Sequence, residues 1–443
     1  MSILRCHLKV IIAGMLAVLV SAFSVTALAH DSPDLPEPVL PAHICARLVP
    51  RQVYSSGDDT QRLQSAIDNC PQGEALQLLA GRFSSGPLTM KSGVTLWISH
   101  GALLAANTDP RIYDENGHCG TLDHKGNGCR PFILFKNTDG GGIVGEGVID
   151  GQGGKLMKGE DESWWQLARR AQTEGAAQNV PRLIEIDDGS NIIFHGITLR
   201  NSPGFHVTLK NARGATFWGV RIDTPANARN TDGIDPISSQ NILIAHSFIR
   251  TGDDNVAIKA GAGGPTRHVL LVDNHFYWGH GMSIGSETVG GVSNIRVRGL
   301  TLDGTTSGLR IKSDISRGGI VSDIRYEDVC MRGNRRPLDF DTRYDVHASG
   351  SNIPVYRDIS LSHIAGETGQ LVLRGYDAAH TLHFALDGVY FSNAARWLIE
   401  SAQLLIGPGG VSPVPPGEAS LQRSSAPADC AKNWIPFPVT DAP

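Results

Sequence analysis

The chain has 443 residues, of which 41% are hydrophobic and 51 are glycine, and its formal net charge is −5. This length suffices for one large core or two ordinary domains. The mildly acidic balance argues against a nucleic-acid-binding protein, and it suits an acidic polymer only if the binding cleft is locally positive.

The first 29 residues have the pattern of a secretory signal peptide. Arg5 and Lys9 give a positive start, an apolar stretch covers residues 10–20, and Ala-Leu-Ala at 27–29 supplies a small-x-small cleavage site. The apolar stretch is short for a membrane span, so an uncleaved anchor is the weaker alternative, and no later stretch approaches the required length of about 20 residues. We expect a secreted protein with no membrane attachment, cleaved after Ala29, whose net charge is −7 because 37 positive side chains face 44 negative ones.

One helix is predicted before the repeats described below, over residues 59–67. Apolar positions, including Leu63 and Ile67, fall on one face, and Asp59 or Thr60 can cap the N-terminus. We expect this helix to cover the N-terminal end of a solenoid, where open strand edges would otherwise pair with other chains.

A short unit recurs along the chain: a polar residue, a β-branched run, a bend and a second apolar pair. Counted from Ile192, successive copies begin 24, 26, 27, 26, 29 and 35 residues apart. The copies are at 191–194, 216–218, 241–244, 268–271, 294–297, 323–326 and 358–361, with earlier ones at 94–97 and 143–145. This spacing is too short for a propeller blade and lacks the signature of a leucine-rich repeat, but it suits one coil of a right-handed parallel β-helix. A β-sandwich is the alternative, although it would not need a near-constant coil length.

An insertion is predicted between the early coils. The step from Ile143 to Ile192 is 49 residues, which is two coils or one coil plus an insertion. Residues 160–177, with Trp164 and Trp165, are expected to form a second helix there. The fold class is therefore all-β, with few helices.

Six cysteines remain once Cys6 leaves with the signal peptide, and an even number in an exported chain indicates disulfides. The local pairings that we favour are Cys45 with Cys70 and Cys119 with Cys129. Cys330 and Cys430 either pair with each other or stay free. Because no Cys-x-x-Cys or clustered histidine spacing is present, we expect no metal and no cofactor.

Three segments result from this organisation. They are a signal peptide at 1–29, a catalytic β-helix at 30–405 and a Gly/Pro-rich tail at 406–443. The tail is expected to be irregular and held, if at all, by Cys430.

Four polar clusters follow one another at steps of 21, 27 and 30 residues, each close to one coil. They are Asn230-Thr231-Asp232, Gly252-Asp253-Asp254-Asn255, Gly279-His280-Gly281 and Arg310-Ile311-Lys312. Stacked coils lie about 4.8 Å apart, so equivalent positions on four coils span roughly 15 Å. This is the size of a saccharide-binding cleft.

Asp232, Asp253 and Asp254 would lie too close together for all three to ionise easily. At least one should have a raised pKa and act as a general acid, while the others deprotonate water, as glycoside hydrolysis requires. Asp253 and Asp254 would point to opposite faces of a regular strand, so a bend is expected at Gly252. His280 can orient the acid or tune its charge.

Arg310 and Lys312 are two residues apart, so both point to one face of a strand, where they suit a substrate carboxylate. Each signal also has a structural alternative. The aspartates can form Asx-turns, a histidine between glycines can be a turn residue, and an Arg-x-Lys can be a solvated face. Together, at coil spacing, the four clusters favour a site.

These motifs resemble those of the polygalacturonases, family 28 of the glycoside hydrolases. The resemblance to the bacterial enzymes runs from about Cys45 to Leu386, and it extends over the stretches 149–154, 163–165, 228–236, 251–259, 279–288 and 308–314. It implies a pectin-lyase-like right-handed β-helix that hydrolyses polygalacturonic acid with inversion.

The resemblance also implies roles for single residues. Asp253 would be the general acid, kept protonated by His280, and Asp232 and Asp254 would deprotonate the attacking water. The side chains expected to bind substrate are Arg310, Lys312, Asn230 and Tyr344, the last being the weaker candidate.

Endo action along polygalacturonate or pectin is expected, because no large insertion between Asn201 and Lys312 blocks the cleft. The alternatives are an exo-polygalacturonase, a pectate lyase that uses Ca²⁺ and an arginine base, and a non-catalytic carbohydrate-binding β-helix. The protein is expected to act as a monomer, without nucleic acid or membrane partners.

Overall fold

The structure is a computed structural model that describes residues 35–51, 58–392, 394–417 and 429–439. The chain divides into two units, residues 1–37 and 38–443, and the fold given below is that of the second unit. The predicted signal peptide lies outside the described residues. The division expected at residues 405 and 406 stays a prediction.

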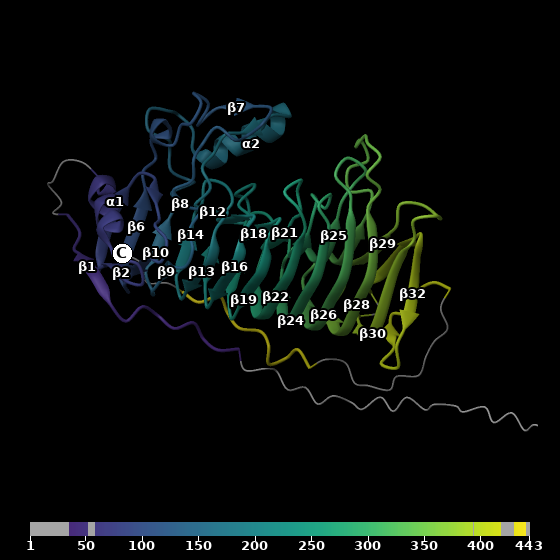
Figure 1. Cartoon of the computed structure of the whole chain (residues 1–443). Coiled ribbons are helices and arrows are strands. Elements are labelled where there is room, and N and C mark those ends of the chain that lie inside the picture. Colours follow the sequence, from purple (N-terminus) through teal and green to yellow (C-terminus); the bar gives the residue numbers. More distant parts are fainter. Residues whose placement is uncertain (1–34, 52–57, 393, 418–428, 440–443) are drawn as a thin grey trace, which may run out of the picture. The chain divides into compact units, whose positions relative to one another are not determined.

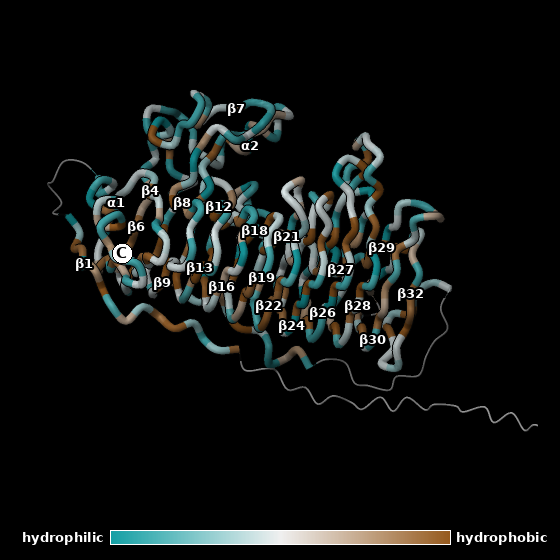
Figure 2. Tube along the Cα trace, in the orientation of Figure 1, coloured by the Kyte–Doolittle hydropathy of each residue, from teal (hydrophilic) through white to brown (hydrophobic). Residues whose placement is uncertain are grey.

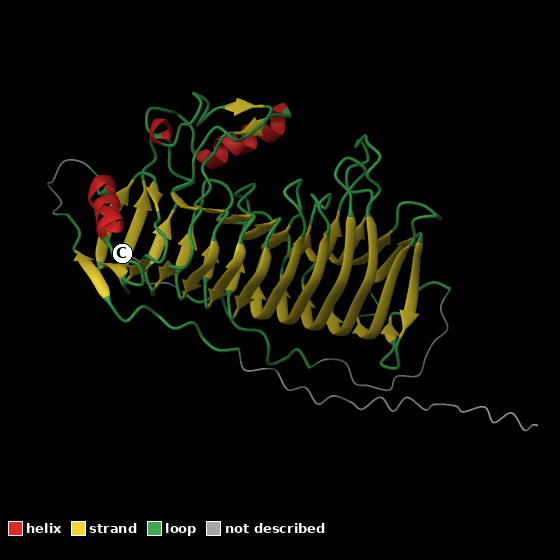
Figure 3. Ribbon diagram, in the orientation of Figure 1, coloured by secondary structure: helices red, strands yellow, loops and turns green. Residues whose placement is uncertain are grey.

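Two parallel sheets, of eleven and twenty strands, share one apolar core (Figures 1 and 3). The eleven-stranded sheet contains β4 (Leu88–Thr89), β8 (Ile133–Lys136), β12 (Ile184–Asp187), β15 (Val207–Lys210), β18 (Ile234–Ile237), β21 (Val256–Ile258), β23 (Met282–Ile284), β25 (Ser307–Lys312), β27 (Arg336–Asp341), β29 (Gln370–Arg374) and β31 (Arg396–Glu400), in this order. Its strands are contributed one by one along the chain, because each turn of the backbone passes once through this sheet. The architecture is the predicted right-handed parallel β-helix.

The twenty-stranded sheet forms the remaining sides of the coils. Its first ten strands are β1 (Ile44–Leu48), β2 (Ala75–Leu78), β3 (Gly81–Ser85), β5 (Thr95–Ile98), β6 (Ala102–Ala106), β9 (Gly142–Val144), β10 (Val148–Asp150), β13 (Ser190–His195), β14 (Thr198–Arg200) and β16 (Arg213–Trp218). The others are β17 (Arg221–Asp223), β19 (Gln240–Ala245), β20 (Phe248–Arg250), β22 (Thr266–Phe276), β24 (Val292–Asp303), β26 (Ile320–Arg332), β28 (Val355–Gly366), β30 (Leu382–Tyr390), β32 (Ala402–Ile406) and β33 (Val411–Ser412).

The predicted repeats occupy equivalent positions on successive coils. Ile192 aligns with Ala215, Ala215 with Ile242, and Ile242 with Val269. The same row continues through Ile295, Ile324 and Ile359. Every member is buried, and Figure 2 shows hydrophobic and hydrophilic residues alternating along the coils. The repeat interpretation is therefore confirmed.

The polar residue that opens six of the nine repeats has a structural reason. It adopts the left-handed backbone conformation, with φ of 55° at Asn191, 60° at Asn241, 55° at His268, 55° at Asn294, 54° at Asp323 and 54° at Asp358. Asn, Asp and His tolerate this conformation better than other non-glycine residues. The recurring polar residue thus marks a corner of the coil.

Helix α1 (Thr60–Asn69) begins one residue later than predicted, and it packs on β3 and β4 at the first coil. Its apolar face is buried through Leu63 and Ile67. Asp59 occupies the N-cap position, but the expected side-chain capping bond is absent. The Asp59 carboxylate instead accepts hydrogen bonds from Arg62 and from the backbone N–H of Ser84.

The step from residue 143 to residue 192 is one coil plus an insertion, because β9 pairs directly with β13. The insertion contains α2 (Trp164–Glu174) and β11 (Ala177–Gln178). β11 pairs antiparallel with β7 (Leu122–Asp123), which belongs, with the 3-10 helix η1 (Pro110–Ile112), to the earlier loop between β6 and β8. A capping box formed by Ser163 and Gln166 starts α2, and the left-handed Gly175 ends it. The second helix is therefore confirmed, with tighter bounds than predicted.

Three disulfides join the six cysteines. Cys45–Cys70 and Cys119–Cys129 are the favoured pairs, and Cys330 pairs with Cys430 rather than staying free. Among the described residues, no helix is long and apolar enough to cross a membrane.

The tail is more ordered than predicted, since it adds β33 beside β30. Beyond Cys430, residues 431–439 form a segment that we call the C-terminal strap. Trp434 packs on Arg332 of β26, and Phe437 packs on Arg250 of β20 at 3.9 Å from the guanidinium carbon to the ring centre. The Tyr277 hydroxyl also donates to a strap carbonyl at 2.6 Å. The strap therefore runs back over earlier coils (Figure 1).

Replacing both Cys330 and Cys430 with serine should release the strap and lower the free energy of unfolding by roughly 2–5 kcal/mol. The expected result is an earlier thermal transition, followed by circular dichroism. The matched control replaces Cys119 and Cys129, which are 10 residues apart rather than 100, so that the smaller loop should give a smaller loss. Equal losses in both variants would contradict a specific role of the strap.

Candidate active site

The four polar clusters come together on neighbouring strands of the eleven-stranded sheet. Asp232 precedes β18, Asp253 and Asp254 precede β21, and His280 precedes β23. Arg310 and Lys312 lie on β25, and the sheet order is β18, β21, β23 and β25. The coil spacing therefore located these residues correctly.

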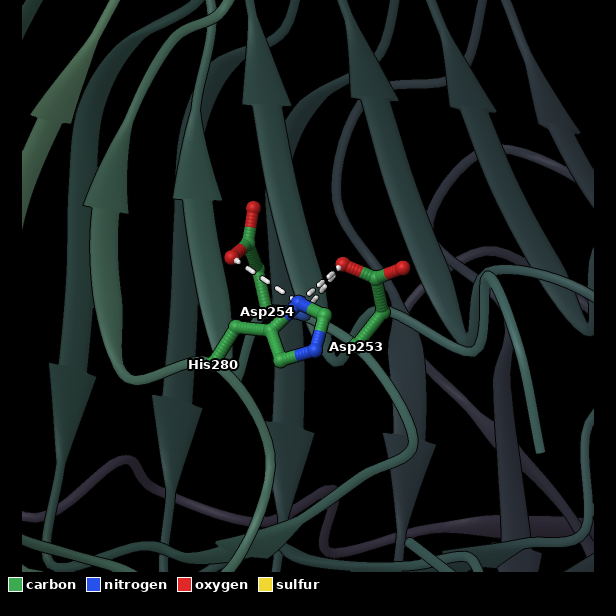
Figure 4. Close-up of side chains that lie close together, drawn as sticks. All are labelled: Asp253, Asp254 and His280. Carbon is green, nitrogen blue, oxygen red and sulfur yellow. Dashed lines mark hydrogen bonds and ion pairs between the residues drawn. The ribbon is translucent and has the colours of Figure 1, made fainter. Parts of the chain in front are cut away.

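Asp253 and His280 form the first pair of the site (Figure 4). The His280 Nδ1 lies 2.9 Å from the Asp253 Oδ1, and the His280 backbone N–H donates to the Asp253 carbonyl at 2.8 Å. Burial lowers the pKa of His280, but the hydrogen bond and charge of Asp253 outweigh burial and raise it. Burial conversely raises the pKa of Asp253, but the hydrogen bond and charge of His280 bring it below its ordinary value.

Asp254 is buried and held by several donors. Its Oδ2 lies 2.8 Å from the Lys312 ammonium, its Oδ1 accepts from the Ser283 hydroxyl at 2.8 Å, and Arg310 Nη1 lies 3.7 Å away. This network orients Asp254 as a carboxylate beside the pair formed by Asp253 and His280.

Gly252 is required at the bend, although its φ is not in the left-handed region. A Cβ at this position would lie 1.9 Å from the Ala228 carbonyl oxygen of the preceding coil. Only glycine therefore permits the close approach that lets Asp253 and Asp254 serve one site.

Asp232 carries the raised pKa that the sequence predicted for one of the three carboxylates. Burial is the main cause, and the nearby negative charges of Asp235 and Asp253 add to it. Lys259 opposes the rise, with its Nζ 3.4 Å from the Asp232 Oδ2. The raised pKa thus falls on Asp232, whereas the hydrogen bond and positive charge of His280 favour the ionised form of Asp253.

Asp235 and Lys259 are residues that sequence analysis missed. The Lys259 ammonium lies 2.6 Å from the Asp235 carboxylate and 4.4 Å from the centre of the Phe205 ring. They are 24 residues apart, so opposite charges one coil apart were the signal that could have identified them.

Arg310 and Lys312 face the same side, as predicted. Arg310 also forms an ion pair with Asp339, the residue aligned with it on β27, at 3.2 Å. The Tyr344 ring centre lies 5.3 Å from the Arg310 guanidinium carbon and 5.4 Å from the Lys312 ammonium. Tyr344 therefore belongs to this cluster, and Asp339 is a further residue that sequence analysis missed.

Asn230 borders the other side of Asp253. Its amide nitrogen lies 3.4 Å from the Asp253 Oδ2, and its Oδ1 accepts from Gln178 of the insertion at 2.9 Å. Beside it is a pocket of about 210 Å³ whose lining includes Phe205 and Arg182. The insertion thus contributes one wall to the site.

Asp253, Asp254 and His280 offer possible ligand atoms within 4.8 Å of one another. The Asp254 oxygens already contact Lys312 and Ser283, however, and the raised pKa of His280 favours an imidazolium, which has no free lone pair. The arrangement favours an ion-pair network, and the expectation that the site needs no metal stays a prediction.

Comparison with known proteins gives consistent matches. The family model of the glycosyl hydrolases family 28 matches residues 70–398. An endo-polygalacturonase from Pectobacterium parmentieri is 43% identical over 392 residues, which cover 87% of this chain and 96% of that protein. A polygalacturonase from Ralstonia nicotianae is 41% identical over 389 residues, covering 76% of this chain and 73% of that protein.

A solved structure matches equally well. The polygalacturonase from Erwinia carotovora ssp. carotovora has a TM-score of 0.81 and 42% sequence identity, and the match covers 85% of this chain and all of that one (100%).

The pairing of Asp253 with His280 leads to a measurable pKa change. In Asp253→Asn the charge that retains the proton on His280 is lost, so burial should dominate and the pKa of His280 should fall. Titration of the imidazole C–H signals by NMR measures this shift. His275, whose pKa is lowered mainly by burial, is the internal control and should not change. An unchanged His280 titration would refute the pairing.

Proposed function

The chain belongs to glycosyl hydrolases family 28, and from this premise we propose that it hydrolyses the α-1,4 linkages of polygalacturonic acid at internal positions and with inversion. The observation that carries the proposal is the juxtaposition, on consecutive coils, of Asp253 paired with His280 and of Arg310 beside Lys312. An acid linked through Asp254 to two cations that can bind a carboxylate suits a substrate with one carboxylate per sugar.

Asp253 serves as the general acid once substrate binds. In the free site, the positive charges of His280 and Lys312 keep its pKa low. A galacturonate carboxylate that pairs with Arg310 and Lys312 offsets part of this charge and adds a negative one nearby, and both effects raise the pKa of Asp253. The proton on His280, at 2.9 Å, can then move to Asp253 and onward to the leaving oxygen.

Asp232 serves as the general base for the attacking water. Its Oδ1 is buried and has no hydrogen-bond partner in the part of the chain that the structure describes, so no described residue competes for this oxygen once a water molecule reaches it. The raised pKa of Asp232 strengthens it as a base when it is ionised. Asp254 helps to hold the water.

Oxygen atoms of the Asp253 and Asp254 carboxylates lie within 4.8 Å of each other. Inverting enzymes usually separate their two carboxyl groups by about 6.5–9.5 Å, and shorter distances are typical of a nucleophile pair. Asp254 is a poor nucleophile here, since Lys312 and Ser283 bind its two oxygens. Attack by water held at Asp232 is therefore the preferred pathway.

Secretion and endo action are also part of this proposal. The three disulfides suit export into an oxidising compartment, as the signal-like residues 1–29 suggested. Endo action is supported by the name of the Pectobacterium parmentieri relative and by the absence of a large insertion between Asn201 and Lys312. We propose that the protein acts as a monomer on pectic polysaccharide without a cofactor.

Inversion is tested by following the first product by NMR. Hydrolysis of an α-linked oligogalacturonide should release the β-anomer before mutarotation, because water attacks from the face opposite the leaving group. Asp253→Asn keeps the shape of the side chain but removes the acid, and it should reduce kcat by roughly 10²-fold or more with an unchanged circular dichroism spectrum. An initial α-product, or a fully active variant, would refute the assignment.

Endo action is tested by comparing viscosity loss with reducing-end release on polygalacturonate. Internal cleavage should halve the viscosity while only a small share of linkages has been cut, whereas an exo enzyme needs extensive hydrolysis. The same digestion in a chelator should proceed without ultraviolet absorbance, which excludes a pectate lyase. If no reducing ends appear, the carbohydrate-binding alternative is favoured.

A further inference from the structure

The proposed roles do not use the buried pair formed by Asp235 and Lys259. Asp235 is fully buried, and Lys259 has a side-chain exposure of 12%. Burying charged groups is costly unless they are paired, so a purely structural purpose would be met by one carboxylate and one ammonium. In this structure, the carboxylates of Asp232 and Asp235 share the single ammonium of Lys259.

The sharing is unequal. The Lys259 Nζ lies 2.6 Å from Asp235 but 3.4 Å from Asp232. The Phe205 ring covers the Lys259 ammonium, with 4.4 Å between the Nζ and the ring centre. Because the Lys259 side chain is largely buried, its ammonium has little room to move to other partners. One oxygen of each carboxylate has no hydrogen-bond partner among the described residues. When both carboxylates are ionised, the cluster carries one more negative charge than positive charge.

We propose that Asp235 and Lys259 are positioning residues that set the protonation state of Asp232 and so its strength as the base. This inference rests on the proposed function of Asp232. Without Lys259, two neighbouring buried carboxylates would share a proton, and Asp232 would be protonated where it must accept one. Without Asp235, Lys259 would pair fully with Asp232 and weaken it as a base.

The directions of the pKa shifts agree with this geometry. Burial and the charge of Asp235 raise the pKa of Asp232, and Lys259 lowers it. Burial raises the pKa of Asp235 to about 6, against the charge of Lys259. The carboxyl groups of Asp232 and Asp235 therefore titrate together rather than independently. The other titratable groups facing the cluster are Asp253, Asp254, Glu287 and His206.

The test is the pH dependence of kcat/KM on polygalacturonate, whose acid limb reports the group that must be deprotonated in the free enzyme. Lys259→Met removes a positive charge, so the acid limb should move to higher pH. Asp235→Asn removes a negative charge, so the limb should move to lower pH. Shifts of roughly 1–3 pH units are expected for charges at these distances.

Two control variants separate this role from a structural one. Lys259→Arg keeps the charge and should leave the limb near that of the wild type. Arg296→Met breaks an ion pair of similar length with Asp323, 2.7 Å, on the twenty-stranded sheet, and should not move the limb. A structural defect would instead lower kcat at every pH without opposite shifts.

The outcomes are distinct. Opposite shifts of the acid limb in Lys259→Met and Asp235→Asn support the proposal. Acid limbs that stay in place, or that move in the same direction in both variants, overturn it. If Lys259→Met does not fold, Asp235→Asn decides alone, because an unmoved or raised limb overturns the proposal. Wild-type enzyme that releases no reducing ends would refute the proposed function instead.

Discussion

The register between coils is the constraint on which the rest of the structure depends. Each strand of the eleven-stranded sheet pairs in parallel with its equivalent on the next coil, so residues about one repeat apart in sequence become direct neighbours. A one-residue slip in the pairing of two strands would turn the side chains of that strand to the opposite face. Extra residues are confined to the turns, so the strand register keeps Asp232, Asp253 and His280 together.

The same register distributes charge across the site. Aligned strands place Asp339 beside Arg310, and Lys312 reaches Asp254 across the coils at 2.8 Å. Asp339 and Asp254 thus each meet a cation supplied by a different coil. This compensation explains how a chain of net negative charge can present cations to a polyanionic substrate without losing the ionised carboxylates that hydrolysis needs.

Sequence analysis recovered the fold and most of the site because both depend on periodicity. Ile192, Ile242 and Ile295 revealed the coil length, and the polar clusters followed at the same length. It missed the side-chain contacts that periodicity does not encode. Asp235 and Lys259 stand next to apolar runs, where a charged residue looks like the solvent-facing end of a strand.

Other details depend on local competition and could not be predicted. Asp59 was a reasonable capping residue, but Arg62 and the Ser84 backbone compete for its carboxylate. Tyr344 came from family resemblance alone, because the length of the turn after β27 carries no periodic signal. The raised pKa could be assigned to Asp232 only from the structure, because it depends on the burial of Asp232 and on the contact of His280 with Asp253 instead.

The C-terminal strap has a consequence for the order of events during biosynthesis. Its last described residues lie against Arg250 and Arg332, which are synthesised more than 100 residues earlier. The faces of these two arginines must stay uncovered until the strap itself has been synthesised. Closure of the Cys330–Cys430 disulfide then fixes this layer, so that a chain that stops before Cys430 lacks it.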